Sequence, residues 1–347
     1  MRFSLAVCAA GLHCAAALAF GTKQGVLVPL RDAAVLESAG QSGSGASDGL
    51  VVGLAAGYAL FTVRRFVGSL RHSGFNGTIV MGVFAGVGAD VRAFAAAHRV
   101  VLADVPADEV TRSKQLLSWR FGWYSRVLAR HCAWPGCSAL LTDVRDVFFQ
   151  ADPLARLSQR EGLHGTSAAG KDALAVFLEY FNARTGNVAI GDDYFNSGWI
   201  RDCWGDAGLA RLAKKPIACA GVLAGSRTAL QRYLTVFQKE QQLHGGRCND
   251  QGVHNWLLHT GRLDPVIAHR QGAGLVNNLG LLKGRAPLTR DAVGFVLDAN
   301  GMRSAAVHQW DRFSHDLRPF VDKLSCGLIA GVPSTSEDCS DWTQAVG

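Results

Sequence analysis

Short, continuous apolar runs recur along the first half of the chain. Four of them, rich in Val, Leu and Ile, occupy residues 50–55, 78–84, 99–105 and 138–143. Runs of this length without polar alternation are typical of strands that are buried on both faces, as in parallel sheets. We therefore predict four strands of one mainly parallel sheet.

Amphipathic stretches separate these runs. Apolar side chains recur at helical spacing over residues 60–70 and 91–97, and a longer helix is predicted over residues 113–131. Strands that alternate with helices indicate an α/β fold with a doubly wound, mainly parallel sheet flanked by helices. Ligands bind such sheets at the carboxyl ends of the strands, so we expect the chemistry there.

The fourth run ends in a group of carboxylates, in the sequence LLTDVRDVFFQADP at residues 140–153. Asp143 follows the run directly, and Asp146 and Asp152 come soon after. Carboxylates at the exposed end of a strand can hold Mg²⁺ or Mn²⁺ against phosphate oxygens. The alternative is structural: Asp143 caps a turn and Asp146 pairs with Arg145.

Two later motifs add to this one. They are CNDQGVHNWLLHTG at residues 248–261 and VHQWDRF at residues 307–313. Together, the three motifs resemble those of the GT-A type nucleotide-diphospho-sugar transferases whose metal motif is Asp-x-Arg-Asp. The resemblance extends over residues 50–320 and implies a GT-A-like fold and a glycosyltransferase activity, either hexosyl or pentosyl.

The resemblance also implies a metal site. Asp143 and Asp146 would supply carboxylates, and a histidine near the end of the domain, which matches His308, would complete the protein ligands. Imidazole suits Mn²⁺ better than Mg²⁺, so Mn²⁺ (or Mg²⁺) is the expected cofactor. The alternative for His308 is a core histidine with satisfied hydrogen bonds.

Other residues are candidates for the donor and the reaction. The family loop that matches Tyr58 contacts the nucleotide, although core packing of Tyr58 is the alternative. Asp250 and Gln251 are the catalytic or acceptor-contacting candidates, unless Asn249 or Asp250 only caps its helix. Small residues at 194–200 and 219–225 are candidate turns that could cradle the sugar. The segment at residues 220–222 is preferred, and the alternative for residues 196–198 is a turn without such a role. The candidate donor contacts are Ala56, Gly57, Tyr58, Arg120, Arg145, Ala220, Gly221 and His254.

The resemblance therefore implies a metal-dependent glycosyltransferase that moves a sugar from a nucleotide-diphosphate sugar to a glycan, protein or small acceptor. A catalytically inactive nucleotide- or glycan-binding scaffold of the same fold is the alternative. Gly57 is not part of a GxGxxG pattern, which disfavours a dinucleotide-dependent dehydrogenase. Arg145 and Val147 break the Asp-x-Asp-x-Thr pattern of haloacid dehalogenase-like phosphatases.

Composition is compatible with this interpretation. The chain has 347 residues, of which 48% are hydrophobic and 18% charged, which excludes a mostly disordered protein. The formal net charge is +7, but Lys and Arg are spread along the sequence without a basic run. We therefore expect no nucleic-acid partner.

The N-terminus has the features of a targeting signal. Residues 1–20 have the form of a secretory signal peptide or signal anchor, followed by a Gly/Ser-rich linker at 21–49. The glycosyltransferase domain is expected at 50–325, with a C-terminal tail at 326–347. We expect the secretory pathway, Golgi lumen or secretion, and membrane contact only through an uncleaved anchor. A glycosylation sequon at residues 76–78 would be modified on that route.

Cysteine usage fits an oxidising compartment. Nine cysteines are present, and seven remain without the two in the signal segment, so at least one is unpaired. Cys132 and Cys137 flank a Pro-Gly turn and are candidates for a local disulfide. Cys326 and Cys339 are a second candidate pair. The others are Cys203, Cys219 and Cys248.

Overall fold

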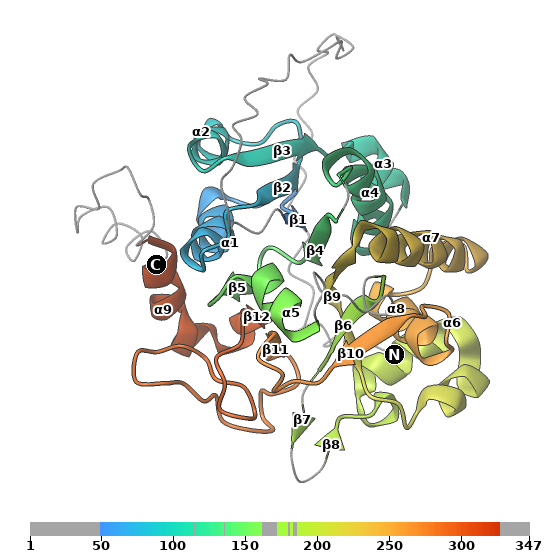
Figure 1. The fold of residues 1–347 in the computed structure, drawn as a ribbon. Helices are drawn as coiled ribbons and strands as arrows, with labels where there is room; N and C mark the ends of the chain where they lie inside the picture. Colours follow the sequence, from blue (N-terminus) through green and yellow to red (C-terminus); the bar gives the residue numbers. More distant parts are fainter. Residues whose placement is uncertain are drawn as a thin grey trace, which may run out of the picture. The chain divides into compact units, whose positions relative to one another are not determined.

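The structure is a computed structural model that describes residues 49–113, 116–134, 136–161, 172–179, 181–182 and 186–326. Figure 1 shows its elements. The strands are β1 (Leu50–Leu54), β2 (Thr78–Val83), β3 (Val100–Asp104), β4 (Ser138–Thr142), β5 (Val147–Phe149), β6 (Leu174–Leu178), β7 (Phe181–Asn182), β8 (Gly186–Asn187), β9 (Ala218–Ser226), β10 (Val266–His269), β11 (Val276–Asn278) and β12 (Ala306–His308). The α-helices are α1 (Leu60–His72), α2 (Ala89–Ala97), α3 (Ala107–Ser113), α4 (Leu116–His131), α5 (Pro153–Glu161), α6 (Tyr194–Leu212), α7 (Arg227–Leu243), α8 (Asp250–His259) and α9 (Ser314–Cys326), with 3₁₀ helices η1 (Ile190–Asp192) and η2 (Trp310–Phe313).

The alternation of strands and helices predicted for the first half is confirmed. The first four strands coincide with the four apolar runs, and α1 and α2 cover the predicted helical stretches. The predicted helix at residues 113–131 corresponds to α4, which begins at Leu116. Helix α3 precedes it and ends at Ser113, and residues 114–115 lie outside the described part.

The main sheet has seven strands in the order β10-β6-β9-β4-β1-β2-β3. Only β9 runs antiparallel to its neighbours, β4 and β6, while the other pairs are parallel. The fold is therefore the mainly parallel α/β arrangement that the sequence predicts. We call the edge at which the six parallel strands end the carboxyl edge; β9 begins there.

Helices cover both faces of this sheet, as Figure 1 shows. Val51 and its neighbours pack against α1, α2 and α5 on one face, whereas Leu50 and Val52 pack against α4, α7 and α8 on the other. Both faces are buried, which explains why the strands are continuously apolar. Each fully buried Val or Leu side chain contributes about 1.5–3 kcal/mol of transfer free energy, so this core dominates the stability of the fold.

A small three-stranded sheet joins the C-terminal part of the described chain to β5, the strand that follows β4. Its order is β11-β12-β5, and β12 is antiparallel to β5, with His308 opposite Val147. Helix α9 packs against α1, where Arg65 and Asp322 form a buried ion pair at 2.5 Å. This long-range pairing carries His308 to the junction between β4 and β5.

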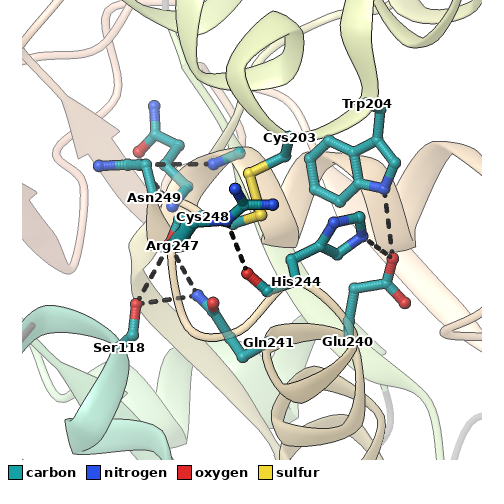
Figure 2. Close-up of a disulfide and its surroundings, with 11 residues drawn as sticks. Ser118, Cys203, Trp204, Glu240, Gln241, His244, Arg247, Cys248 and Asn249 are labelled. Atoms are coloured by element: carbon teal, nitrogen blue, oxygen red, sulfur yellow. Dashed lines mark hydrogen bonds and ion pairs between the residues drawn. A yellow bond between two sulfur atoms is a disulfide. The ribbon is translucent and has the colours of Figure 1, made fainter. Parts of the chain in front are cut away.

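Two disulfides are present in the described part. The predicted Cys132–Cys137 bond is confirmed, and a second bond joins Cys203 of α6 to Cys248, two residues before α8. Figure 2 shows the second bond and its surroundings. The Gln241 Nε2 donates to the Cys248 carbonyl at 2.9 Å, so the segment that leads into α8 is held at several points. Cys219 is a buried free thiol.

None of the helices in the described ranges is both long and apolar enough to cross a membrane. The signal segment, nearly all of the linker and residues 327–347 lie outside those ranges. Cys339 is among them, so the candidate Cys326–Cys339 pair stays a prediction.

Candidate functional site

Three candidate metal ligands meet at the carboxyl edge. Asp143 follows β4, Asp146 precedes β5, and His308 ends β12, which pairs with β5. One ligand atom of each residue lies within 4.8 Å of the others. The His308 Nε2 is 3.3 Å from Asp143 Oδ2 and 3.9 Å from Asp146 Oδ1. The structure therefore brings together the three residues that the sequence predicted as ligands.

The orientation of His308 suits a ligand. Its Nδ1 lies 2.9 Å from the Asn278 side-chain oxygen, which accepts a hydrogen bond from the Nδ1–H. Burial opposes a charged ring, but Cys219, Asp143 and Asp146 outweigh it and raise the pKa of His308, so without a cation Nε2 also carries a proton and donates to Asp143. A bound cation would take the place of that Nε2 proton. A hydrogen bond from the other ring nitrogen, which fixes the orientation of the imidazole in this way, is typical of metal-binding histidines. The Cys219 sulfur is also 3.3 Å from Nδ1.

The two carboxylates of the cluster are held in surroundings that oppose their ionisation. Burial raises the pKa of Asp146, and the nearby Asp143 and Asp311 raise it further against His308. Burial also opposes ionisation of Asp143, but Arg120 and His308 outweigh it and hold the pKa of Asp143 below its usual value. Two neighbouring carboxylates of this kind favour a divalent cation, which would relieve their repulsion. The residues present thus fit a metal site.

Gly221 provides the room for this cluster. A Cβ atom on Gly221 would lie 2.5 Å from Asp143 Oδ2 and 2.6 Å from His308 Cε1. The expected turn at residues 219–225 is wrong, because these residues lie within β9. Gly221 is required by the side chains of Asp143 and His308, which pack over the strand. The pairing of β9 with β6 shifts register beside residues 220–222.

Arg120 links the Asp143–Asp146–His308 cluster to α8. Its guanidinium donates to Asp143 Oδ1 and, at 2.8 Å, to Asp250 Oδ2. Burial disfavours its charge, but Asp143 and Asp250 outweigh burial and raise the pKa of Arg120 well above its usual value. Arg120 is therefore a permanent buried cation that holds two carboxylates at the carboxyl edge.

The first turn of α8 carries Asp250 and Gln251 to this edge. Asn249 caps the helix, because its side-chain oxygen accepts a hydrogen bond from the backbone N–H of Gln251 at 2.9 Å. This cap is the alternative that the sequence analysis gave for Asn249. Asp250 Oδ1 accepts from the same N–H at 2.9 Å, so both of its carboxylate oxygens have partners. Gln251 Nε2 donates to Glu179 and to Asn196, each at 3.0 Å.

Sequence reasoning missed Glu179. It directly follows β6, is 2% exposed, and lies close enough to His308 and Cys219 to interact with both. Burial raises its pKa, against the effects of His308 and Gln251. The signal was present, because an apolar run that ends in an acidic residue also identified Asp143.

The loop after β1 also lies at the carboxyl edge. It contains Ala56, Gly57 and Tyr58, and Gly57 adopts a φ of +82°, which favours glycine. Tyr58 is half-buried and packs against the core, as the alternative interpretation expected. Tyr58 also interacts electrostatically with Tyr124, whose hydroxyl donates to the Thr142 carbonyl beside Asp143.

Arg145 pairs with carboxylates. Its guanidinium is 3.2 Å from Asp311 and 3.6 Å from Asp146, and the side chain is 44% exposed. Arg145 therefore pairs with Asp146, as the structural alternative from the sequence expected, and its side chain is also accessible to solvent.

Two expectations are wrong. His254 is completely buried and its Nδ1 is 3.1 Å from the Tyr233 hydroxyl, so it belongs to the core and is not a donor contact. Residues 194–200 form the first turns of α6 and not a cradling turn, because Asp193 caps the helix by accepting from the Asn196 N–H.

A cavity of about 490 Å³ lies at the opposite edge of the sheet, near the start of β1 and β2. Its lining includes Arg71, Arg99 and Trp134 but no carboxylate. Among the described residues, the side chains that could hold a cation thus lie at the carboxyl edge and not in this cavity.

No protein-family model and no curated protein matches the sequence. Several solved structures are similar in shape. The galactosyltransferase LgtC, in complex with donor and acceptor sugar analogues, aligns with a TM-score of 0.49 and 15% identity, over 84% of this chain and 99% of that chain. Apo mouse xyloside xylosyltransferase 1 aligns with a TM-score of 0.42 and 10% identity, over 74% and 96% of the two chains. Core-mannan synthase A from Aspergillus fumigatus, in a Mn/GDP form, aligns with a TM-score of 0.39 and 11% identity, over 67% and 74%. TM-scores below 0.5 at such identities do not establish a family.

Proposed function

We propose that this protein is a metal-dependent glycosyltransferase, which moves a sugar from a nucleotide-diphosphate sugar to a glycan, protein or small acceptor. The observation that carries this proposal is the cluster of Asp143, Asp146 and His308 at the carboxyl edge. Phosphate oxygens and water would complete the coordination around these three ligands. The resemblance of three sequence motifs to GT-A type transferases supports the same class.

The donor set favours Mn²⁺ over Mg²⁺. Two carboxylates and one imidazole nitrogen suit a metal that accepts both oxygen and nitrogen. A bound Mn²⁺ would act as a Lewis acid that neutralises the negative charge of the departing diphosphate. Arg145, which is partly exposed beside Asp146, would add a second positive charge for the same anion.

Arg120 and Asp250 have a positioning role in this proposal. Arg120 is buried and occupied by two carboxylates, so it fixes Asp143 rather than binding the nucleotide directly. Both oxygens of Asp250 accept hydrogen bonds, which makes Asp250 a poor general base in this arrangement. Its carboxylate instead holds the start of α8 against the metal ligands.

Gln251 is the residue of α8 that we assign to the substrate. Its Nε2 is committed to Glu179 and Asn196, so the amide oxygen is the atom that can face the sugar or the acceptor hydroxyl. Glu179 orients this amide from the end of β6. An amide oxygen beside the anomeric carbon would stabilise positive charge there as the diphosphate leaves.

A lumenal or secreted location is part of the proposal. Two disulfides are typical of oxidising compartments and rare in reducing ones. The form of residues 1–20 supports the same route.

Nucleotide release by the purified full chain, with a panel of UDP- and GDP-sugars, tests the function. We expect release from one donor with Mn²⁺ and its loss in EDTA. Release that persists in EDTA would contradict metal dependence. No release from any donor, with nucleotide binding still measurable by calorimetry, would instead identify an inactive scaffold.

A further inference from the structure

Three aromatic side chains cluster at the start of α6. Tyr194 is 85% exposed and Phe195 is 49% exposed. Their ring centroids are 5.4 Å apart in an edge-to-face arrangement, and Phe195 lies 6.0 Å from Trp199. We call Tyr194, Phe195 and Trp199 the aromatic platform. Aromatic rings that meet one another in solvent present a continuous apolar surface, and such surfaces commonly mark binding sites.

The platform is built on a fixed helix start. Asp193 caps α6 by accepting from the Asn196 backbone N–H at 2.9 Å and from its side-chain amide at 2.8 Å. The exposed rings are therefore held on an ordered helical turn, as a preorganised binding surface requires.

The platform adjoins the site described above. Asn196, between Phe195 and Trp199 in the sequence, accepts from Gln251 Nε2 at 3.0 Å. A Cβ on Gly252 would lie 3.2 Å from Trp199 Cβ, so the first turns of α6 and α8 are in close contact. A ligand on the platform would thus lie next to the helix turn that carries Gln251.

We propose that the aromatic platform is the acceptor subsite and that it binds a neutral carbohydrate by stacking. This inference rests on the proposed glycosyltransferase function. One face of many pyranose rings presents only C–H groups, which pack well on the electron-rich face of an aromatic ring. The Tyr194 hydroxyl and the neighbouring amides would hydrogen-bond to the sugar hydroxyls. An acceptor held there would direct one hydroxyl toward Gln251.

The flanking charges favour a neutral sugar. Asp192 and Asp193 precede the platform and Asp202 follows it in the first part of α6, before the kink at Gly205. The one basic residue between 192 and 206, Arg201, is paired with Asp206 at 2.8 Å. Acidic residues repel an anionic donor and an anionic membrane surface, which attract Lys and Arg instead. A neutral glycan carries no such penalty.

The test is a double variant of the full chain, Tyr194→Ala with Phe195→Ala. With methyl glycosides of glucose, galactose, mannose and xylose as acceptors, we expect the acceptor KM to rise at least tenfold. The donor KM and the slow release of nucleotide without acceptor should not change, because the metal cluster is intact. Trp134→Ala is the matched control, because Trp134 is an exposed aromatic residue at the opposite edge of the sheet.

Two results would overturn the inference. The first is an unchanged acceptor KM in the double variant. The second is binding of the wild type to phosphatidylserine vesicles that the double variant loses, which would make the platform a membrane surface. A wild type that releases nucleotide from no donor would overturn the proposed function instead. Saturation-transfer NMR with the same glycosides then tests the platform alone: signals lost in the double variant support it, and equal signals refute it.

Discussion

The space above Gly221 gives the sharpest test of the metal geometry. In Gly221→Ala, the new Cβ would lie 2.5 Å from Asp143 Oδ2 and 2.6 Å from His308 Cε1, whereas ordinary contacts begin at 3.4 Å. Each ligand must therefore retreat by about 0.8 Å, several times the roughly 0.2 Å tolerance of metal–ligand distances. We expect Mn²⁺ affinity to fall about 10- to 100-fold, or about 1.4–2.7 kcal/mol.

The substitution should leave the fold intact. Gly221 does not adopt a left-handed conformation, so alanine is compatible with its backbone. Overpacking of this kind costs about 1–3 kcal/mol, which is less than the stability of a typical domain. Calorimetric titration with Mn²⁺ and UDP, together with circular dichroism, measures both effects. Gly86→Ala is the control, because nothing lies within 4 Å of its Cβ position. A folded Gly221→Ala protein with wild-type Mn²⁺ affinity would refute the assigned geometry.

Three further predictions follow from other contacts. Glu179→Ala frees the Gln251 amide and should lower kcat about 10- to 100-fold without changing Mn²⁺ affinity, whereas Glu179→Gln keeps the acceptor oxygen and should retain most activity; equal losses in steady-state assays would contradict this role. Burial lowers the pKa of His254 to about 3 in the folded protein. Between about pH 6.5 and pH 3, His254 is therefore protonated in the unfolded chain but not in the folded one. Urea unfolding should show stability falling as the pH drops from 6.5 toward 3, by up to about 1.4 kcal/mol per unit from this group, and His254→Gln should remove that part of the slope. Cys203→Ser breaks the bond to Cys248 and should cost about 2–4 kcal/mol in urea unfolding, and an unchanged midpoint would count against it.

The sequence predicted the strands and helices of the first half of the chain, because these elements follow from apolar patterns over short stretches. The four apolar runs became β1 to β4, and the acidic residues at the end of the fourth run lie where a parallel sheet exposes its strand ends. The Cys132–Cys137 bond was also predictable, because the two residues flank a turn. Asn249 caps α8, as one alternative expected.

The errors arose where small or polar residues have more than one physical explanation. Gly221 indicated a turn, but its lack of a side chain makes room for Asp143 and His308 above a strand. Asn196 and Gly198 also indicated a turn, although Asp193 before them is a helix cap. His254 lies one turn after Asp250, but periodicity does not reveal that Tyr233 encloses it in the core.

Other features depend on long-range pairing that one sequence cannot reveal. β9 inserts antiparallel between β4 and β6, and Glu179 at the end of β6 lies close enough to interact with His308 and Cys219. Likewise, only the pairing of β12 with β5 shows that His308 meets Asp146. The three motifs predicted that these residues act together, but the topology explains how they meet.

The most direct test of the central claim compares nucleotide release by the wild type, Asp143→Ala and His308→Ala across a Mn²⁺ titration, with the donor that the wild type accepts. If the cluster holds the catalytic metal, both variants should stay folded by circular dichroism and lose Mn²⁺-dependent release at every concentration. Full activity in either folded variant would contradict the metal assignment and, with it, the mechanism proposed for this site.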